Sequence, residues 1–320
     1  MKIVVLDGYT LNPGDISWSA LKELGELIVY DRTPYQNKAI LNNIADAEII
    51  FTNKTPIDKE ILNKAPNLKY IGVLATGYNV VNIKLAKSKN IVVTNIPDYS
   101  SGAVAQFTMG LLLELCHNIG AHNVSVKNGD WVKSKDFCYW NSPLMELAGK
   151  TLGLIGFGKI GKATAKLAQA FGLKVLLFTR TVDQSLATDN LQFVSLDNLL
   201  EQSDFVSLHC PLTIETEEII NATTIAKMKQ SAMLINTSRG LLVNEHDLAE
   251  ALNEGKITAA AVDVVSEEPM KSNNPLLNAK NCITTPHIAW APKEARVRLM
   301  QIAVNNLQSF LNENPNNVVS

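Results

Sequence analysis

Residues 151–171 decide the fold of this chain, and they read TLGLIGFGKIGKATAKLAQAF. The apolar run at 152–155 is typical of a buried strand, and the run at 162–171 is typical of a helix. Between them lies a G-x-G-x-x-G turn, formed by Gly156, Phe157, Gly158, Lys159, Ile160 and Gly161. In such a turn the first glycine permits the tight bend, the second lets a pyrophosphate approach the backbone, and the third lets the helix pack closely on the strand. Because the free N–H groups at a helix N-terminus bind anions, this context predicts a dinucleotide-binding turn; without the context the motif would also fit an ordinary strand–helix turn.

The next strand lacks the acidic residue that usually follows such a turn. It ends Phe178-Thr179-Arg180, with Thr179 eighteen positions after Gly161. An Asp or Glu there would bind the adenosine ribose and repel a 2′-phosphate, whereas Arg180 offers a guanidinium to that phosphate. The sequence therefore predicts NAD(P)(H) as the cofactor, with NADP(H) modestly favoured. The alternative is a solvated Arg180, with NAD(H) held by hydroxyl groups.

Apolar runs alternate with helical segments along the whole chain, in two series. The first series lies at 3–7, 27–31, 47–52, 70–75 and 91–95, and the second at 151–156, 174–179, 205–209, 233–237, 259–263 and 282–286. Runs that are apolar nearly end to end suit parallel strands covered on both faces. The prediction is an α/β protein with two doubly wound parallel-sheet domains, since 320 residues exceed one ordinary domain.

The two domains are expected to be nested. A Rossmann-like cofactor domain, 99–287, is inserted in a discontinuous, flavodoxin-like substrate domain formed by 1–98 and 288–320, with the active site in the cleft between them. A long helix at 100–120, ended by Gly120, is expected to link the two, followed by a loop at 127–145. An amphipathic helix at 292–312 is expected to return the chain to the first domain.

The composition excludes several classes of protein. Hydrophobic residues make up 46% of the chain, charged residues 19%, and the net charge is −2. This suits a globular protein without the clustered basic face that nucleic acids require. No apolar stretch is long enough to span a bilayer, and no secretory signal opens the chain, so we expect no membrane association and a cytoplasmic location. The four cysteines form no CxxC pair, and no metal site is expected.

Three ionisable residues follow strands of the second series. Arg239 comes after INTS at 235–238, Glu268 lies in VDVVSEEP, and His287 follows TTP at 284–286. The carboxyl ends of parallel strands share one edge of a sheet, where ligands bind. Reduction of a 2-keto acid needs a proton donor, a carboxylate that supports it, and a cation for the substrate's carboxylate. Each residue alone fits a structural role; their joint placement at one edge predicts this chemistry.

Several of these motifs, taken in order, resemble the D-isomer-specific 2-hydroxyacid dehydrogenases. The similar stretches are LATGYN (74–79), GLIGFGKIG, HCPLT (209–213), INTSRG (235–240), VDVVSEEP and TPHIAW (285–290). HIAWAPKEAR resembles the glycerate dehydrogenase and hydroxypyruvate reductase branch in particular. The resemblance covers most of the chain. It implies a D-specific oxidoreductase that interconverts small 2-keto and 2-hydroxy acids, with hydroxypyruvate/D-glycerate and glyoxylate as the expected substrates.

The resemblance also implies roles for residues. His287 would be the acid/base, Glu268 its partner, and Arg239 the group that binds substrate carboxylate and carbonyl. The backbone of Thr76 and Gly77 would bind the substrate carboxylate from the first domain. Further cofactor contacts would come from Cys210, Pro211, Thr237, Ser238 and Asp263.

The resemblance leaves other possibilities open. Relatives usually form dimers through the linking helix and the loop after it, so a homodimer is expected. Some relatives act instead as NAD(H)-sensing corepressors that keep the fold and even the three ionisable residues. Others use a different D-2-hydroxy acid or phosphoglycerate.

Overall fold

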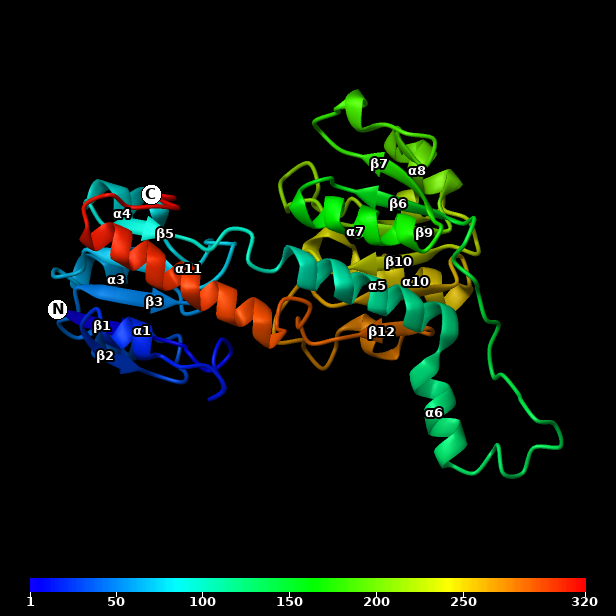
Figure 1. The fold of residues 1–320 in the computed structure, drawn as a ribbon, viewed down its shortest axis with the longest axis horizontal. Helices are drawn as coiled ribbons and strands as arrows, with labels where there is room; N and C mark the ends of the chain where they lie inside the picture. The colour runs from blue at the N-terminus through cyan, green and yellow to red at the C-terminus, as the bar shows by residue number, and fades with distance from the viewer. The chain divides into compact units, whose positions relative to one another are not determined.

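The computed structural model describes residues 1–320 and divides into two compact units (Figure 1). Unit 1 comprises Met1–Ser100 and Ala291–Ser320, and unit 2 comprises Ser101–Trp290. The boundaries expected from the sequence, after residues 98 and 287, lie two and three residues from these.

Unit 1 is built on a five-stranded parallel sheet in the order β2-β1-β3-β4-β5. This is the flavodoxin-like order that the sequence predicts. The strands are β1 (Lys2–Val5), β2 (Glu26–Val29), β3 (Ile49–Thr52), β4 (Tyr70–Val73) and β5 (Val92–Thr94), and the helices are α1 (Ser19–Lys22), α2 (Asn37–Ile44), α3 (Lys59–Lys64), α4 (Ile83–Ser88) and α11 (Lys293–Leu311). Every residue of β3 and β4 is buried, as continuous apolar runs require.

Helix α11 lies at the sequence position expected for the final helix and completes unit 1. Its Phe310 ring packs on the Tyr70 ring of β4, with 4.9 Å between the centroids. Near its start, Arg296 makes two hydrogen bonds of 2.7 Å to the carboxylate of Asp15 and a third, of 3.0 Å, to the Leu11 carbonyl. A guanidinium held by a bidentate carboxylate fixes the helix in orientation as well as position.

Unit 2 contains a seven-stranded parallel sheet in the order β12-β11-β10-β9-β6-β7-β8. Apart from the added edge strand β12, this is the Rossmann order, with the reversal between β6 and β9. The strands are β6 (Thr151–Ile155), β7 (Lys174–Phe178), β8 (Leu191–Phe193), β9 (Phe205–Leu208), β10 (Met233–Asn236), β11 (Ala259–Val262) and β12 (Cys282–Thr284). The prediction of two doubly wound parallel sheets is confirmed.

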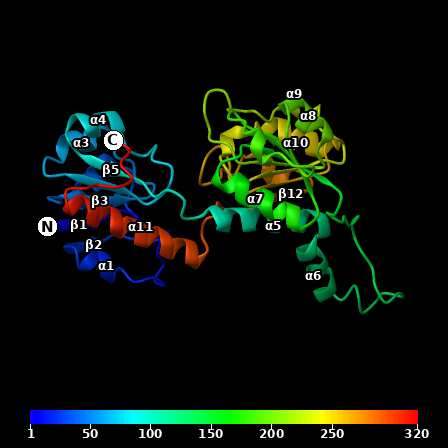
Figure 2. The same ribbon diagram turned by 45° about the horizontal axis from the view of Figure 1, so that its top comes forward.

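Helices cover both faces of this sheet (Figure 2). One buried cluster joins the strands to α5 (Ser101–His117) and α7 (Lys159–Ala170), and the other joins them to α8 (Leu196–Gln202), α9 (Ala222–Ile225) and α10 (Glu245–Glu254). Three short 3-10 helices complete the unit: η1 (Gln184–Leu186), η2 (Gly240–Leu242) and η3 (Pro275–Asn278). No helix of the chain is both long and apolar enough to cross a membrane.

The expectation of one helix ended by Gly120 is wrong. Helix α5 ends at His117, Asn118 adopts a left-handed conformation (φ 48°, ψ 43°), and α6 (Ile119–Lys127) begins directly afterwards. Asparagine tolerates this conformation better than most residues, so the chain bends there and Gly120 lies inside α6. Residues 128–150 contain no helix or strand. Helix α6 and the residues after it extend away from the sheet, and the chain has returned to it by Leu147, which is buried in the cluster with α5 and α7 (Figure 1).

Candidate active site

The predicted ionisable residues follow three neighbouring strands of the seven-stranded sheet. Arg239 comes after β10, Glu268 after β11, and His287 after β12, and these strands are adjacent in the order β12-β11-β10. Because all three strands are parallel, the residues lie beyond the same edge, at the carboxyl ends.

Glu268 and His287 are in direct contact. The Nδ1 atom of His287 lies 2.7 Å from Oε2 of Glu268, and the two side chains are 29% and 33% exposed. With the proton on Nδ1, the imidazole donates to the carboxylate, and this hydrogen bond fixes the orientation of the ring. The pair therefore has the geometry of a proton donor and the carboxylate that supports it.

The loop that carries His287 is held by one buried carboxylate. Asp263, only 1% exposed, accepts hydrogen bonds from Thr285 Oγ1 (2.6 Å), Ile288 N (2.9 Å) and Ala289 N (2.8 Å). These donors flank His287, whose backbone is left-handed at φ 55°. The contacts of Asp263 in the structure thus go to this loop, whereas the contact with nicotinamide that the resemblance implies stays a prediction.

The turn that carries Arg239 is built by Asn236. The Asn236 side chain donates to the Arg239 carbonyl (2.8 Å) and accepts from Ser238 N (3.0 Å). Ser238 Oγ donates to the Cys210 carbonyl (2.7 Å), and Thr237 Oγ1 lies 3.0 Å from Thr108 Oγ1. The bond between Ser238 and Cys210 joins predicted cofactor residues that follow β10 and β9, and the contact with Thr108 ties Thr237 to α5.

The Arg239 side chain is available for an anion. Arg239 is exposed, it forms no ion pair, and its guanidinium donates only to the Ser238 carbonyl (2.7 Å). An exposed guanidinium without a carboxylate partner can bind a carboxylate in a bidentate manner.

The three glycines of the phosphate-binding turn meet different surroundings. A Cβ on Gly156, whose φ is +101°, would lie 2.5 Å from Cys210 N, and one on Gly161 would lie 2.5 Å from the Gly156 carbonyl oxygen. A Cβ on Gly158 would meet no atom within 4 Å. The first and third glycines are therefore needed for packing. The second leaves open space beside the N-terminus of α7, which begins at Lys159 and includes Ile160. These residues fit a dinucleotide.

Two ionisable groups beside this turn are uncharged at neutral pH. Burial lowers the pKa of His209 to about 4, and its Nε2 lies 3.0 Å from Ser207 Oγ. Burial raises the pKa of the Cys210 thiol to about 11, so that no thiolate nucleophile is available. Neither group suits acid/base chemistry near pH 7. The carbonyl of Pro211, which follows Cys210, accepts from Thr216 Oγ1 (2.7 Å).

The residues expected to select the cofactor follow β7 as predicted. Thr179 is half-buried, and Arg180 is exposed and forms no ion pair. The pKa of Glu215 is lowered, mainly by a hydrogen bond from Thr213 Oγ1 (2.6 Å) and least of all by the positive charge of Arg180. Glu215 is thus an acid in the surroundings of Arg180 that sequence reasoning missed, because it lies 35 residues further along the chain.

Thr76 and Gly77 follow β4 in unit 1. Thr76 Oγ1 donates to the Ile96 carbonyl (2.8 Å), and the Thr76 carbonyl accepts from Asn95 Nδ2 (2.8 Å). The turn is therefore tied to the chain that follows β5.

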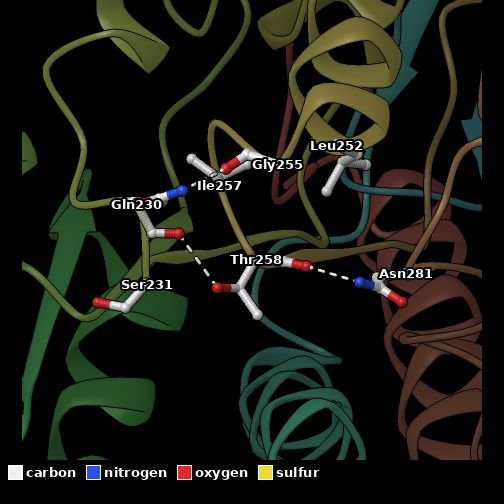
Figure 3. Close-up of a pocket in the computed structure, with 7 residues that line it drawn as sticks. All are labelled: Gln230, Ser231, Leu252, Gly255, Ile257, Thr258 and Asn281. Atoms are coloured by element: carbon white, nitrogen blue, oxygen red, sulfur yellow. Dashed lines mark hydrogen bonds between the residues drawn. The ribbon is translucent and has the colours of Figure 1, made fainter.

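A surface hollow of 660 Å³ does not contain any of these residues (Figure 3). Its lining comes from the other edge of the sheet, just before β10, β11 and β12, and consists of Gln230, Ser231, Leu252, Gly255, Ile257, Thr258 and Asn281. Several of its polar groups bond to one another, as in the bond from Thr258 Oγ1 to the Gln230 carbonyl (3.1 Å). The hollow therefore offers no reactive group.

Comparison with known proteins identifies the class. Residues 109–289, more than half of the chain, match the family model described as "D-isomer specific 2-hydroxyacid dehydrogenase, NAD binding domain". The chain belongs to this family, and it is an NAD(P)-binding oxidoreductase of the 2-hydroxyacid dehydrogenase class, as the sequence predicts.

Particular relatives match over the full length. The chain is 56% identical to a hydroxypyruvate reductase of Blautia hydrogenotrophica over 100% of both chains. It is 42% identical to a glycerate dehydrogenase of Methylorubrum extorquens, over 99% of this chain and 98% of that one. Among solved structures, an acyclic imino acid reductase in complex with NADPH and D-Arg has a TM-score of 0.86 and 30% identity over 100% of both chains. The predicted branch of the family, glycerate dehydrogenase and hydroxypyruvate reductase, is confirmed by the first two.

Proposed function

We propose that this protein reduces hydroxypyruvate to D-glycerate, and glyoxylate more slowly, with NAD(P)H as the reductant. The observation that carries the proposal is the 2.7 Å contact between Glu268 and His287 at the sheet edge where Arg239 also lies. The names of the relatives support hydroxypyruvate over other keto acids. Unit 2 would be the cofactor domain and unit 1 the substrate domain.

The three ionisable side chains divide the chemistry between them. NAD(P)H, held at the turn from Gly156 to Gly161, would supply the hydride for C2 of the keto acid. As the new C–H bond forms at C2, His287 donates a proton to the carbonyl oxygen, and Glu268 orients the imidazole ring for this transfer. Arg239 binds the substrate carboxylate and polarises the carbonyl, assisted by the backbone of Thr76 and Gly77. The products are the 2-hydroxy acid and NAD(P)⁺, and His287 regains its proton from solvent.

The cofactor would be held mainly by the glycine turn and by the residues after β7 and β10. The turn from Gly156 to Gly161, at the N-terminus of α7, would bind the pyrophosphate. Thr237, Ser238 and the chain at Cys210 and Pro211 would line the nicotinamide side. Arg180, exposed and without an ion pair, would pair with a 2′-phosphate, and on this ground we propose a modest preference for NADP(H).

We also propose a homodimer formed through α6 and residues 128–145. This segment exposes large apolar side chains that a monomer would leave in water, among them Val132 (89%), Phe137 (89%) and Trp140 (65%). Large apolar side chains exposed together in one segment are typical of interaction surfaces. The cytoplasmic location stays a prediction from the sequence.

The test measures the oxidation of NADPH and NADH in parallel by purified protein with hydroxypyruvate, glyoxylate and larger keto acids. We expect hydroxypyruvate to give the highest kcat/KM and His287→Ala to lose most of the turnover while it still binds the cofactor. General acid–base groups contribute about 10²–10⁴-fold, which sets the expected loss. Cofactor binding without turnover of any keto acid would favour the alternative, a cofactor-sensing protein of the corepressor kind.

A further inference from the structure

We propose that Glu245 is a positioning residue that holds the loop of Glu268 in place opposite His287. The inference rests on the proposed roles of Glu268 and His287 in the reduction. Glu245 is the first residue of α10, and neither the family motifs nor the reaction scheme gives it a role.

The carboxylate of Glu245 makes three hydrogen bonds, all to the segment that carries Glu268. Its Oε1 accepts from Ser266 N (2.6 Å), and its Oε2 accepts from Ser266 Oγ (2.7 Å) and from Asn274 Nδ2 (2.9 Å). Ser266 lies two residues before Glu268, and Asn274 lies six residues after it. Glu245 therefore binds the loop on both sides of Glu268, whose carboxylate contacts His287.

The loop needs such an anchor because it contains no regular element of its own. Between the end of β11 and the start of η3, residues 263–274 form neither helix nor strand. The segment consequently has no ladder of backbone bonds to fix the direction of Glu268. Within the loop, Val265 N donates to Glu268 Oε1 at 3.5 Å, the limit of a useful hydrogen bond.

The other side of the same loop is fixed by η2. A Cβ on Gly240 would lie 1.9 Å from the carbonyl carbon of Val265, so the backbones of the Arg239 turn and the Glu268 loop are in contact. Gly240 and Glu245 belong to one short connection, from η2 to the first residue of α10. This connection therefore fixes the position of Arg239, proposed to bind the substrate carboxylate, relative to Glu268, proposed to support the proton donor.

A glutamate suits this position better than its amide. Three donors converge on two carboxylate oxygens, whereas a glutamine has one acceptor oxygen and an NH₂ group that would face another donor. The negative charge also lies in the first turn of α10, where the free N–H groups of a helix favour it. Glu245→Gln keeps the size of the side chain and loses at least one of the bonds to Ser266 or Asn274.

The experiment is a double-mutant cycle with kcat and KM measured for the reduction of hydroxypyruvate by NADPH. Glu245→Gln is expected to lower kcat about tenfold with KM changed less than threefold, since misplacement of a catalytic group by about 1 Å costs on the order of 100-fold and part of the anchor remains. In the background of Glu268→Gln, the same change should lower kcat less than twofold, because residues that act through one another are not additive. Glu250→Gln, an exposed glutamate on the same helix, is the matched control and should leave kcat unchanged.

The outcomes separate this inference from the proposed function. If Glu245→Gln lowers kcat equally with and without Glu268, the residue acts through general stability and the inference is wrong. If Glu268→Gln itself has no effect, or the wild type reduces no keto acid, the proposed function fails first. Should Glu245→Gln not fold, Ser266→Ala removes only the Oγ bond and must show a smaller loss with the same dependence on Glu268.

Discussion

Gly240 provides the sharpest steric test of the proposed site. Gly240→Ala places a Cβ 1.9 Å from the carbonyl carbon of Val265, 2.0 Å from its oxygen and 2.4 Å from Ser266 N. Ordinary contact begins at 3.4 Å, so the Val265–Ser266 backbone must move by about 1.5 Å, the difference between 3.4 and 1.9 Å. These residues lie two and three positions before Glu268, and the displacement is expected to reach its carboxylate.

The magnitude follows from the size of that displacement. A shift of about 1 Å in a catalytic group costs about 100-fold, so kcat/KM for hydroxypyruvate should fall on the order of 100-fold. Overpacking of this kind costs about 1–3 kcal/mol of stability, and a domain of 150–250 residues loses about 2–4 °C in Tm for each kcal/mol. The assay combines steady-state kinetics, thermal unfolding and NADPH binding, which should be largely retained. A variant with near-wild-type kcat/KM, or one that loses only Tm, would refute the reasoning.

Three further predictions concern the cofactor turn, the cofactor preference and unit 1. Gly158→Ala projects a methyl group into open space, so Tm should not change, while the Kd of NADPH and NADH measured by fluorescence titration should both rise about tenfold or more, the equivalent of about 1.4 kcal/mol. Arg180→Ala should weaken NADPH about tenfold to 100-fold, as expected for a charged hydrogen bond of about 1.5–3 kcal/mol, and NADH hardly at all; equal effects on both would contradict the phosphate-binding role. The pKa of Asp15 is held below its ordinary value of 3.8, chiefly by the hydrogen bond from Arg296, so this pair stabilises unit 1 above that pH and its contribution is lost as pH falls through the lower folded value. Asp15→Asn should therefore have a lower Tm at pH 7 and a shallower decline in Tm from pH 5 to pH 3 than the wild type, and parallel curves would disprove the linkage.

The strands were predictable because a strand buried on both faces consists of apolar residues nearly end to end. Runs such as Ile49–Thr52 and Tyr70–Val73 are apolar throughout, and both are buried in full. The strand at Leu191–Phe193 was missed because the exposed Gln192 stands in its middle, so no continuous apolar run marks it. The end of the linking helix was predicted at Gly120, two residues after Asn118, where the chain bends. Both residues tolerate positive φ, and the sequence does not show which of them adopts it.

The candidate site was predictable as a set of residues and not as a geometry. Parallel strands place whatever follows them at one edge, and this rule alone brought Arg239, Glu268 and His287 together. Their order in the family motifs supplied roles, which the turnover of the variants will test.

The 2.7 Å contact between Glu268 and His287 depends on groups that no local pattern marks. Asp263 reaches residues 22 to 26 positions away, and Glu245 reaches residues 21 and 29 positions away. Such bonds are set by the packing of β11, β12 and α10 against one another, so they exist only once the sheet has formed. Both carboxylates bind loop donors on either side of a proposed catalytic residue, one around His287 and one around Glu268. Pre-organisation at this edge therefore comes from acids that touch no substrate, and the effect of removing either one should depend on the catalytic group it holds.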